Sequence, residues 1–171
     1  MCAVSRGKDF EGCVQDSIEQ LNQPNNHVSI VRLYDPQGGQ LGVSNPCDFI
    51  AYKRPQEYWL ECKSTHANTL SIYTAPNPKN KKYGAFSNTQ WEEMLKASKN
   101  GVVAGGLVWW IAHDVTKFIP IQELEKLRNA GAKSIRYDLD IPNSLIIKGR
   151  KKRIYFDYDF SEFFETYKNG C

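Results

Sequence analysis

The sequence predicts an α/β fold in which a central mixed β-sheet is flanked by helices. Segments whose apolar residues recur at helical spacing alternate with segments rich in β-branched and aromatic residues. One near-continuous apolar run, from Val102 to Ala112, is typical of a strand that is buried on both faces. The length of 171 residues and the hydrophobic content of 41% suit one globular domain with a substantial core.

The composition limits the partners and the compartment. Twenty-two Lys and Arg against nineteen Asp and Glu give a net charge of +3, which permits a polyanionic partner without requiring one. The five cysteines form no C-x-x-C pair, and the N-terminus carries no apolar signal segment. The run from Val102 to Ala112 is too short to cross a bilayer. We therefore expect a cytoplasmic protein with free thiols and no membrane contact.

The first elements are a helix and a strand. Phe10, Val14 and Leu21 fall at helical spacing, and Asp9 is a suitable N-cap, so we expect a helix over about 10–21. Glu11, in its first turn, lies at the edge of the apolar stripe. The β-branched segment from residue 28 to residue 34 predicts a strand.

The stretch from Pro46 to Lys63 predicts a hairpin that gathers charged side chains. Two short apolar runs flank a polar turn that contains a proline. Side chains alternate between the faces of a strand, so Glu61 and Lys63 project to the same side. A hairpin also folds the start of its first strand beside the end of its second, which brings Asp48 near this pair.

The remaining elements follow in order. Ser87 is a good N-cap for a helix that ends near Lys99, before an Asn-Gly stop signal. The long polar segment before it, over 64–86, is either functional or mobile. We then expect a central strand, a short partner strand, a helix, and finally a strand with a closing helix, over 102–112, 117–120, 121–130 and 154–164 respectively. The predicted domain core spans about 5–130, with a basic and aromatic extension over about 131–171.

Three interpretations of Asp48, Glu61 and Lys63 are open. Short patterns of this kind are most often surface charges at strand ends. Against that interpretation, both acids adjoin strongly apolar runs. The second interpretation is metal-assisted hydrolysis of phosphodiesters, because carboxylate oxygens suit Mg²⁺ and a nearby lysine can stabilise the transition state. The third is a nucleic-acid-binding protein with a decayed site, which the intact set of residues disfavours.

The motifs resemble those of a known nuclease superfamily. The pattern P-x-D…E-x-K, from Pro46 to Lys63, resembles the PD-(D/E)XK nucleases and, more narrowly, the RecU-type Holliday-junction resolvases. Further matches are Arg6-Gly7-Lys8-Asp9-Phe10-Glu11 to R-G-x-x-F-E, Cys47-Asp48-Phe49-Ile50-Ala51 to x-D-Y/F-x-G, Leu60-Glu61-Cys62-Lys63 to F-E-A-K, and Phe86-Ser87-Asn88-Thr89-Gln90 to F-x-x-H-Q. The chain departs from the family at Pro46 and Thr89, and its segment between Lys63 and Gln90 is longer. The region before Asp48 is short for the family's stalk, which would fit a compact, phage-type version.

The resemblance implies a fold, an activity and a set of roles. The fold would be restriction-endonuclease-like, and the activity would be an Mg²⁺-dependent endodeoxyribonuclease that resolves four-way DNA junctions, with Mn²⁺ as a substitute ion. Asp48, Glu61 and Gln90 would bind the metal. Lys63 would stabilise the transition state, and Glu11 would act as an additional acid near the metal or as a group that positions water. Other superfamily endonucleases and a non-catalytic recombination accessory are the alternative functions.

Basic residues supply the candidate DNA contacts. They lie near the N-terminus, in the long polar segment and in a basic run near the C-terminus, at Arg6, Lys79, Lys81, Lys82, Arg150, Lys151, Lys152 and Arg153. Such residues would contact phosphates rather than read bases. A junction has two-fold symmetry, so its resolution implies a C₂ homodimer acting on branched double-stranded DNA. Trp109 and Trp110, in contrast, are expected in the core or at a dimer contact, and not to stack on bases.

Overall fold

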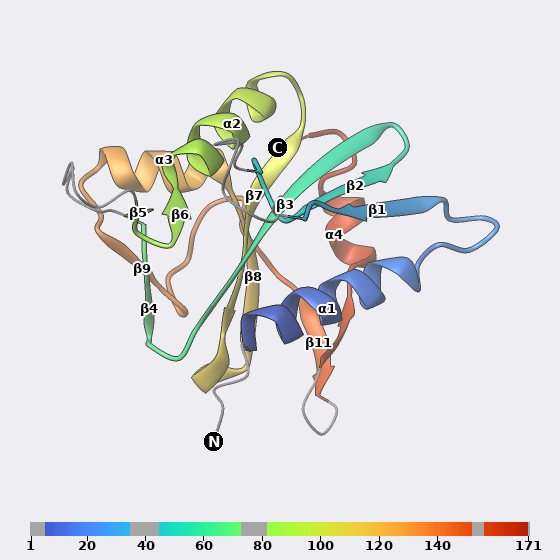
Figure 1. The fold of residues 1–171 in the computed structure, drawn as a ribbon, viewed down its shortest axis with the longest axis horizontal. Helices are drawn as coiled ribbons and strands as arrows, with labels where there is room; N and C mark the ends of the chain where they lie inside the picture. Colours follow the sequence, from blue (N-terminus) through green and yellow to red (C-terminus); the bar gives the residue numbers. More distant parts are fainter. Residues whose placement is uncertain (1–5, 35–44, 73–81, 152–155, 171) are drawn as a thin grey trace.

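A six-stranded mixed sheet forms the centre of the molecule (Figure 1). The structure, a computed structural model, describes residues 6–34, 45–72, 82–151 and 156–170. The strands of the sheet lie in the order β1 (Val28–Arg32), β2 (Phe49–Lys53), β3 (Gln56–Thr65), β7 (Val103–Trp110), β8 (Val115–Pro120) and β10 (Leu145–Ile146). This sheet with its flanking helices confirms the predicted α/β class.

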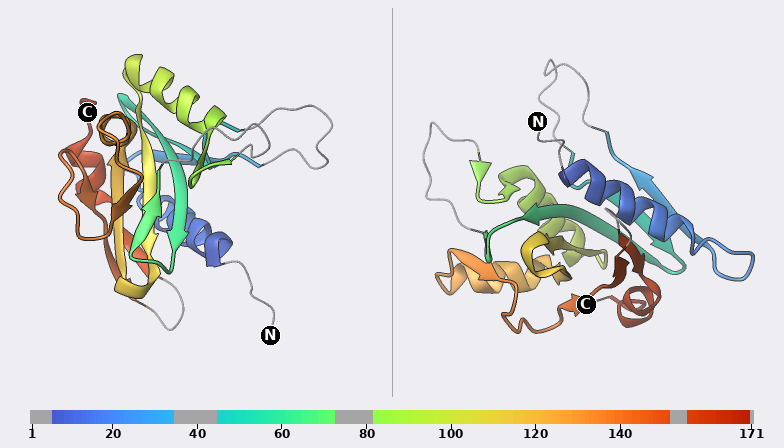
Figure 2. Two further views of the ribbon diagram at one scale, coloured as in Figure 1. Left: turned by 90° about the vertical axis from the view of Figure 1, so that its left-hand side faces the viewer. Right: turned by 90° about the horizontal axis from the view of Figure 1, so that it is seen from below.

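The sheet combines antiparallel and parallel pairs. β1, β2 and β3 form an antiparallel meander, and β3 then pairs parallel with β7, which lies beside it in the left view of Figure 2. The crossover from β3 to β7 includes helix α2 (Asn88–Lys99). All eight residues of β7 are buried, as the apolar run in the sequence predicts for a central strand.

Helices cover the two faces of the sheet (Figure 1). One face packs against α1 (Arg6–Glu19), β12 (Phe156–Asp159) and α4 (Ser161–Thr166), in a core rich in aromatic rings. The opposite face packs against α2 and α3 (Ile121–Asn129). Three two-stranded sheets lie beside the main sheet; their strands are β4 (Thr69–Ser71) with β9 (Ser134–Arg136), β5 (Lys82–Tyr83) with β6 (Phe86–Ser87), and β11 (Lys148–Lys151) with β12.

The structure differs from the predicted elements at the start of the first helix and at the basic run near the C-terminus. Helix α1 begins at Arg6, so Asp9 lies in its first turn, where a carboxylate interacts favourably with the helix dipole, and is not the N-cap. The basic run at residue 148 forms strand β11, because it pairs with β12. Trp109 and Trp110 are both buried, as expected. Within the described residues, no helix is long and apolar enough to span a membrane.

Candidate active site

Asp48 is held in place by three hydrogen bonds, two of which join it to β3. It lies just before β2, where its backbone N–H donates to the carbonyl of Leu60 at 3.1 Å and its carbonyl accepts from Leu33 N–H at 2.8 Å. Its carboxylate oxygen Oδ2 also accepts the backbone N–H of Cys62 at 2.7 Å. The acid at the start of the hairpin therefore lies beside the strand segment that carries Glu61.

Glu61 is fully buried in the middle of β3, yet its carboxylate is only half satisfied. Oε1 accepts hydrogen bonds from the ammonium group of Lys63 and, at 2.7 Å, from Nε2 of Gln90. Oε2 is buried and has no hydrogen-bond partner among the described residues. An unpaired carboxylate oxygen in a protein interior is costly unless a cation or a proton joins it.

The buried site affects the protonation of Glu61. Burial raises the pKa of this carboxyl group to about 7, because water no longer stabilises the charge. The positive charge of Lys63 opposes this rise in pKa, and the negative charge of Asp48 adds to it. The two carboxylates thus repel each other, and among the described residues the ammonium group of Lys63 is placed against only one oxygen of Glu61. Such a site favours a bound cation.

The donors available suit a hard cation. Within the described residues, no cluster of three or more His, Cys, Asp and Glu side chains is placed to hold a metal. Mg²⁺ does not need such a cluster, since it typically binds through one or two carboxylates, several waters and substrate phosphate oxygens. Burial raises the pKa of the thiols of Cys47 and Cys62, so these neighbours stay neutral and do not compete as thiolate ligands. Asp48 and Glu61 therefore fit the predicted ion.

Gln90 reaches the site from the first turn of α2. Ser87 caps this helix: its Oγ accepts Gln90 N–H at 3.2 Å, and Gln90 Oε1 accepts Ser87 N–H at 2.9 Å, which is a complete capping box. The structure thus brings together Glu61, Lys63 and Gln90 through direct hydrogen bonds. The metal-binding role predicted for Gln90 remains a prediction.

The space for the ring of Phe86 beside the site depends on a glycine in the strand next to β3. Gly106 of β7 lies opposite Glu61 in the parallel ladder. A Cβ atom at Gly106 would lie 2.7 Å from the ring of Phe86, well inside contact distance. The ring of Phe86 in turn lies 5.7 Å from Lys63 Nζ. The missing side chain therefore makes room for the aromatic ring against which the lysine packs.

Glu11 lies on α1 and is engaged with a residue that the sequence did not indicate. Its carboxylate forms an ion pair with Arg32 of β1, and both side chains are half-buried. The charge of Glu11 also contributes to the raised pKa of Cys62, which places it near the edge of the site. Arg32 lies in the expected first strand, but no local pattern pairs it with an acid 21 positions earlier.

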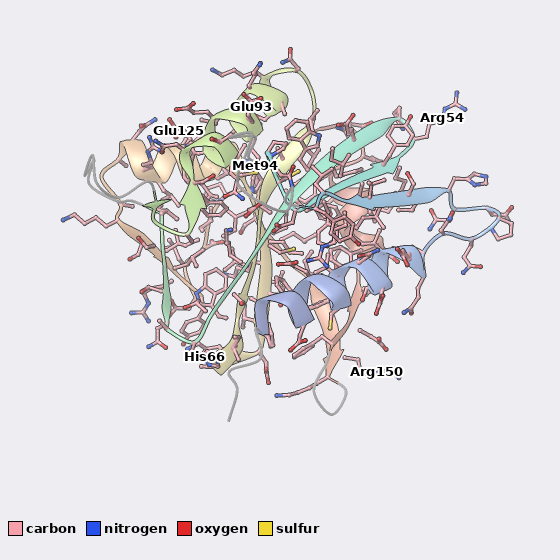
Figure 3. All side chains as sticks on the ribbon, viewed as in Figure 1. Arg54, His66, Glu93, Met94, Glu125 and Arg150 are labelled. Atoms are coloured by element: carbon pink, nitrogen blue, oxygen red, sulfur yellow. The ribbon has the colours of Figure 1, made fainter. Side chains whose placement is uncertain are left out.

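The basic run of β11 is exposed and already paired with acids. Arg150 contacts Asp157 at 3.4 Å, and Lys151 contacts Asp114 at 2.7 Å. Figure 3 places Arg150 near the end of the β11–β12 hairpin, below α1. Exposed pairs of this kind contribute little to stability and can be exchanged for phosphate contacts. For the other candidate DNA contacts the structure describes either no part of the residue or only its backbone. They are Arg6, Lys79, Lys81, Lys82, Lys152 and Arg153.

Figure 3 also shows the extent of β3 on either side of the site. Arg54 marks the β2–β3 turn, and His66 follows the far end of β3. The candidate site lies between them, where β2 has ended and β3 continues. Part of β3 thus extends beyond its antiparallel partner, and the charged side chains are at that transition.

Of three comparisons with known proteins, only the one with solved structures found a similar protein. No protein-family model matches the sequence. No curated protein matches it either. Among solved structures, the chain is similar to Hjc of Archaeoglobus fulgidus, a Holliday junction resolvase from an archaeal hyperthermophile, with a TM-score of 0.46 and 17% sequence identity over 68% of this chain and 78% of that one. A likeness at this level carries no functional argument, so the function must be inferred from the residues of the site.

Proposed function

We propose that this chain is an Mg²⁺-dependent endodeoxyribonuclease of the PD-(D/E)XK type that resolves four-way DNA junctions as a homodimer. The observation that supports this most directly is the state of Glu61. Its buried carboxylate has one oxygen bound by two donors and the other without a partner among the described residues, and a second carboxylate, Asp48, is fixed beside it. A structural ion pair would need only Glu61 and Lys63.

Asp48 and Glu61 would hold the cation between them. When bound, the ion would neutralise part of the negative charge that builds up on the phosphate during hydrolysis. The hydrogen bond from Cys62 N–H keeps the Asp48 carboxylate from turning away from β3. Lys63 and Gln90 favour the ionised form of Glu61, which is the form that binds a cation.

Lys63 would supply the fixed positive charge of the site. Its side chain is 22% exposed, so the ammonium group is reachable by a phosphate although its partner, Glu61, is buried. The contact with Glu61 and the nearby Phe86 ring limit the positions that the ammonium can take. A preorganised charge of this kind stabilises a transition state without needing to reorganise during the reaction.

The preference for junctions is the more specific part of the proposal. It is supported by the motif resemblance. The homodimer follows from the junction preference, since a four-way junction needs two matched cuts and a C₂ dimer presents two equivalent sites. The exposed basic residues of β11, Arg150 and Lys151, would contact the phosphates of the junction arms.

The proposal is tested by cleavage of a synthetic four-way junction and of a linear duplex with the same sequence. We expect Mg²⁺ to support cleavage of the junction in preference to the duplex. Ca²⁺ should support binding without cleavage, because its larger and more flexible coordination fits a magnesium site poorly. Equal cleavage of both DNAs would indicate a general endonuclease. Binding without cleavage in every metal would indicate a non-catalytic DNA-binding protein and would contradict the proposal.

A further inference from the structure

The side chain of Gln90 is bound at both ends of its amide group. Nε2 donates to Glu61 Oε1 at 2.7 Å, and Oε1 accepts the backbone N–H of Ser87 at 2.9 Å. The second bond belongs to the capping box that starts α2, so it forms whenever the helix is properly capped. The amide group is therefore a bridge between the helix start and the buried carboxylate.

The chemistry of its two partners determines which way the amide faces. A backbone N–H can only donate a hydrogen bond, so the atom facing Ser87 must be the amide oxygen. An ionised carboxylate can only accept, so the atom facing Glu61 must be the NH₂ group. Both partners require the same orientation. Turning the amide over would place two donors together at Ser87 and two acceptors together at Glu61.

This orientation bears on metal binding. Hard cations such as Mg²⁺ bind oxygen, and the NH₂ group of an amide is not a ligand for them. The single amide oxygen of Gln90 already accepts the Ser87 N–H and faces away from Glu61. We infer that Gln90 is a positioning residue for Glu61 and not a metal ligand, and that Ser87 acts with it by fixing the direction of the amide.

The inference rests on the proposed function, which makes Glu61 a ligand, and it assigns a role to Ser87 that no motif indicates. Two donors, Lys63 Nζ and Gln90 Nε2, hold the same oxygen of Glu61. The other oxygen, Oε2, is thereby directed away from both and left available to a cation. The capping box of α2 would thus serve the site as well as the helix.

Nuclear magnetic resonance of the full chain tests the direction of the amide. The measurement is the scalar coupling across the hydrogen bond between the Gln90 side-chain nitrogen and the Glu61 carboxyl carbon, without metal and with saturating Mg²⁺. We expect the coupling in both states. Loss of the coupling in Mg²⁺, with a shift of the Gln90 carbonyl carbon, would mean that the amide has turned its oxygen to the ion. Absence of the coupling in both states would also overturn the inference.

A matched pair of variants tests the role of Ser87. Ser87→Ala and Ser87→Pro both remove the hydroxyl that caps α2, but only Ser87→Pro also removes the backbone N–H. Ser87 has a φ of −74°, which proline adopts without strain. The measurement is calorimetric titration with Mg²⁺ alone. We expect Ser87→Pro to bind Mg²⁺ roughly tenfold more weakly than Ser87→Ala, because it also loses one hydrogen bond of the network that holds the charged Glu61. Equal affinities would contradict the role of the N–H.

These tests separate the two proposals. If the wild-type protein cuts no DNA, the proposed function fails, but the coupling between Gln90 and Glu61 in the metal-free protein still decides the direction of the amide. If the protein cuts junctions with Mg²⁺ and the coupling is lost when the metal binds, the proposed function stands and the inference about Gln90 fails. Because the coupling is measured on the wild-type chain, it does not depend on how well the variants fold.

Discussion

Glu61 is the residue on which the chemistry of the site depends, because its carboxylate is buried and, among the described residues, only one of its oxygens has hydrogen-bond partners. Its position in the middle of β3 keeps it from water, and Lys63 and Gln90 hold one side of it. Asp48 adds a second negative charge close to Glu61, and this charge is not needed for the pairing of the strands. This combination costs stability in the metal-free protein and favours a bound cation.

The pKa of Glu61 predicts how the metal-free protein responds to pH. The pKa of this carboxyl group is about 7 in the folded state and has its ordinary value of 4.5 in the unfolded chain. Between these values the folded state holds more protons, so the free energy of unfolding falls as the pH rises and then levels off above about 7. The loss is on the order of 3 kcal/mol at ~1.4 kcal/mol per pKa unit. Urea unfolding in the presence of a chelator, from about pH 5 to about pH 8, measures it.

Glu61→Gln is the matched control for this prediction. Its neutral amide keeps the size of the side chain and cannot titrate, so the decrease in stability over this pH range should disappear. Added Mg²⁺ should restore stability to the wild type near pH 8 and leave Glu61→Gln unchanged. An identical pH dependence in the two proteins would show that Glu61 is not the titrating group.

At this scale the sequence predicts some relations between residues and misses others. Strand alternation places Glu61 and Lys63 on one side, and hairpin geometry brings Asp48 to them; both relations are local and hold in the structure. The ion pair between Glu11 and Arg32 joins a helix to a strand, so only the packed fold reveals it. The same is true of the direction of the Gln90 amide.

At the scale of elements, β7 creates the room in which the site is built. Gly106 leaves a gap opposite Glu61 that the ring of Phe86 fills, and α2 begins immediately after β6, the strand that carries Phe86. The ring of Phe86 therefore packs beside the site because position 106 of β7 carries no side chain.

Gly106→Ala should destabilise the protein by about 1–3 kcal/mol, because its new methyl group would overlap the Phe86 ring in a packed interior. Gly12→Ala is the matched control, since a Cβ at Gly12 meets nothing within 4 Å in helix α1. This second change should stabilise the protein by about 0.5–1 kcal/mol through helix propensity. Thermal or urea unfolding of both variants checks the pair, and destabilisation of similar size in both would rule out the packing explanation.

The main elements could be predicted, whereas the small ones could not. Helix α2 has a local capping signal at Ser87, and β7 has an unbroken apolar run. Strand β4, in contrast, has three residues and pairs with β9 more than sixty positions later, which leaves no local trace. In β11 all four residues are exposed, so there is no alternation to detect.

At the scale of the whole molecule, exposed cations would guide the DNA to the site. In the described part of the chain, Arg150 and Lys151 are the predicted DNA contacts whose side chains can be placed, and each now faces an acid. In the free protein each acid offsets the positive charge of its partner. Binding to DNA would replace each acid by a phosphate, so the contribution of these residues should appear mainly in the salt dependence of affinity.

The double variant Arg150→Ala with Lys151→Ala should bind the junction more weakly, and the slope of log affinity against log salt should fall by about 2, roughly 0.9 for each lost phosphate contact. Lys168→Ala removes an exposed lysine that pairs with Glu165 and is the control, with an unchanged slope expected. Fluorescence anisotropy over a salt series gives both slopes. If the double variant keeps the slope of the wild type, DNA does not contact this hairpin.

The assignment of Asp48 and Lys63 to catalysis is tested most directly by measuring junction cleavage and junction binding in Asp48→Ala and Lys63→Ala. We predict that both variants bind the junction with affinity close to that of the wild type and lose cleavage by at least about a hundredfold in saturating Mg²⁺. Asp48→Ala lacks a ligand of the ion that hydrolysis needs, and Lys63→Ala lacks the charge that stabilises the transition state. Cleavage at the rate of the wild type in either variant, with binding intact, would contradict the assigned site.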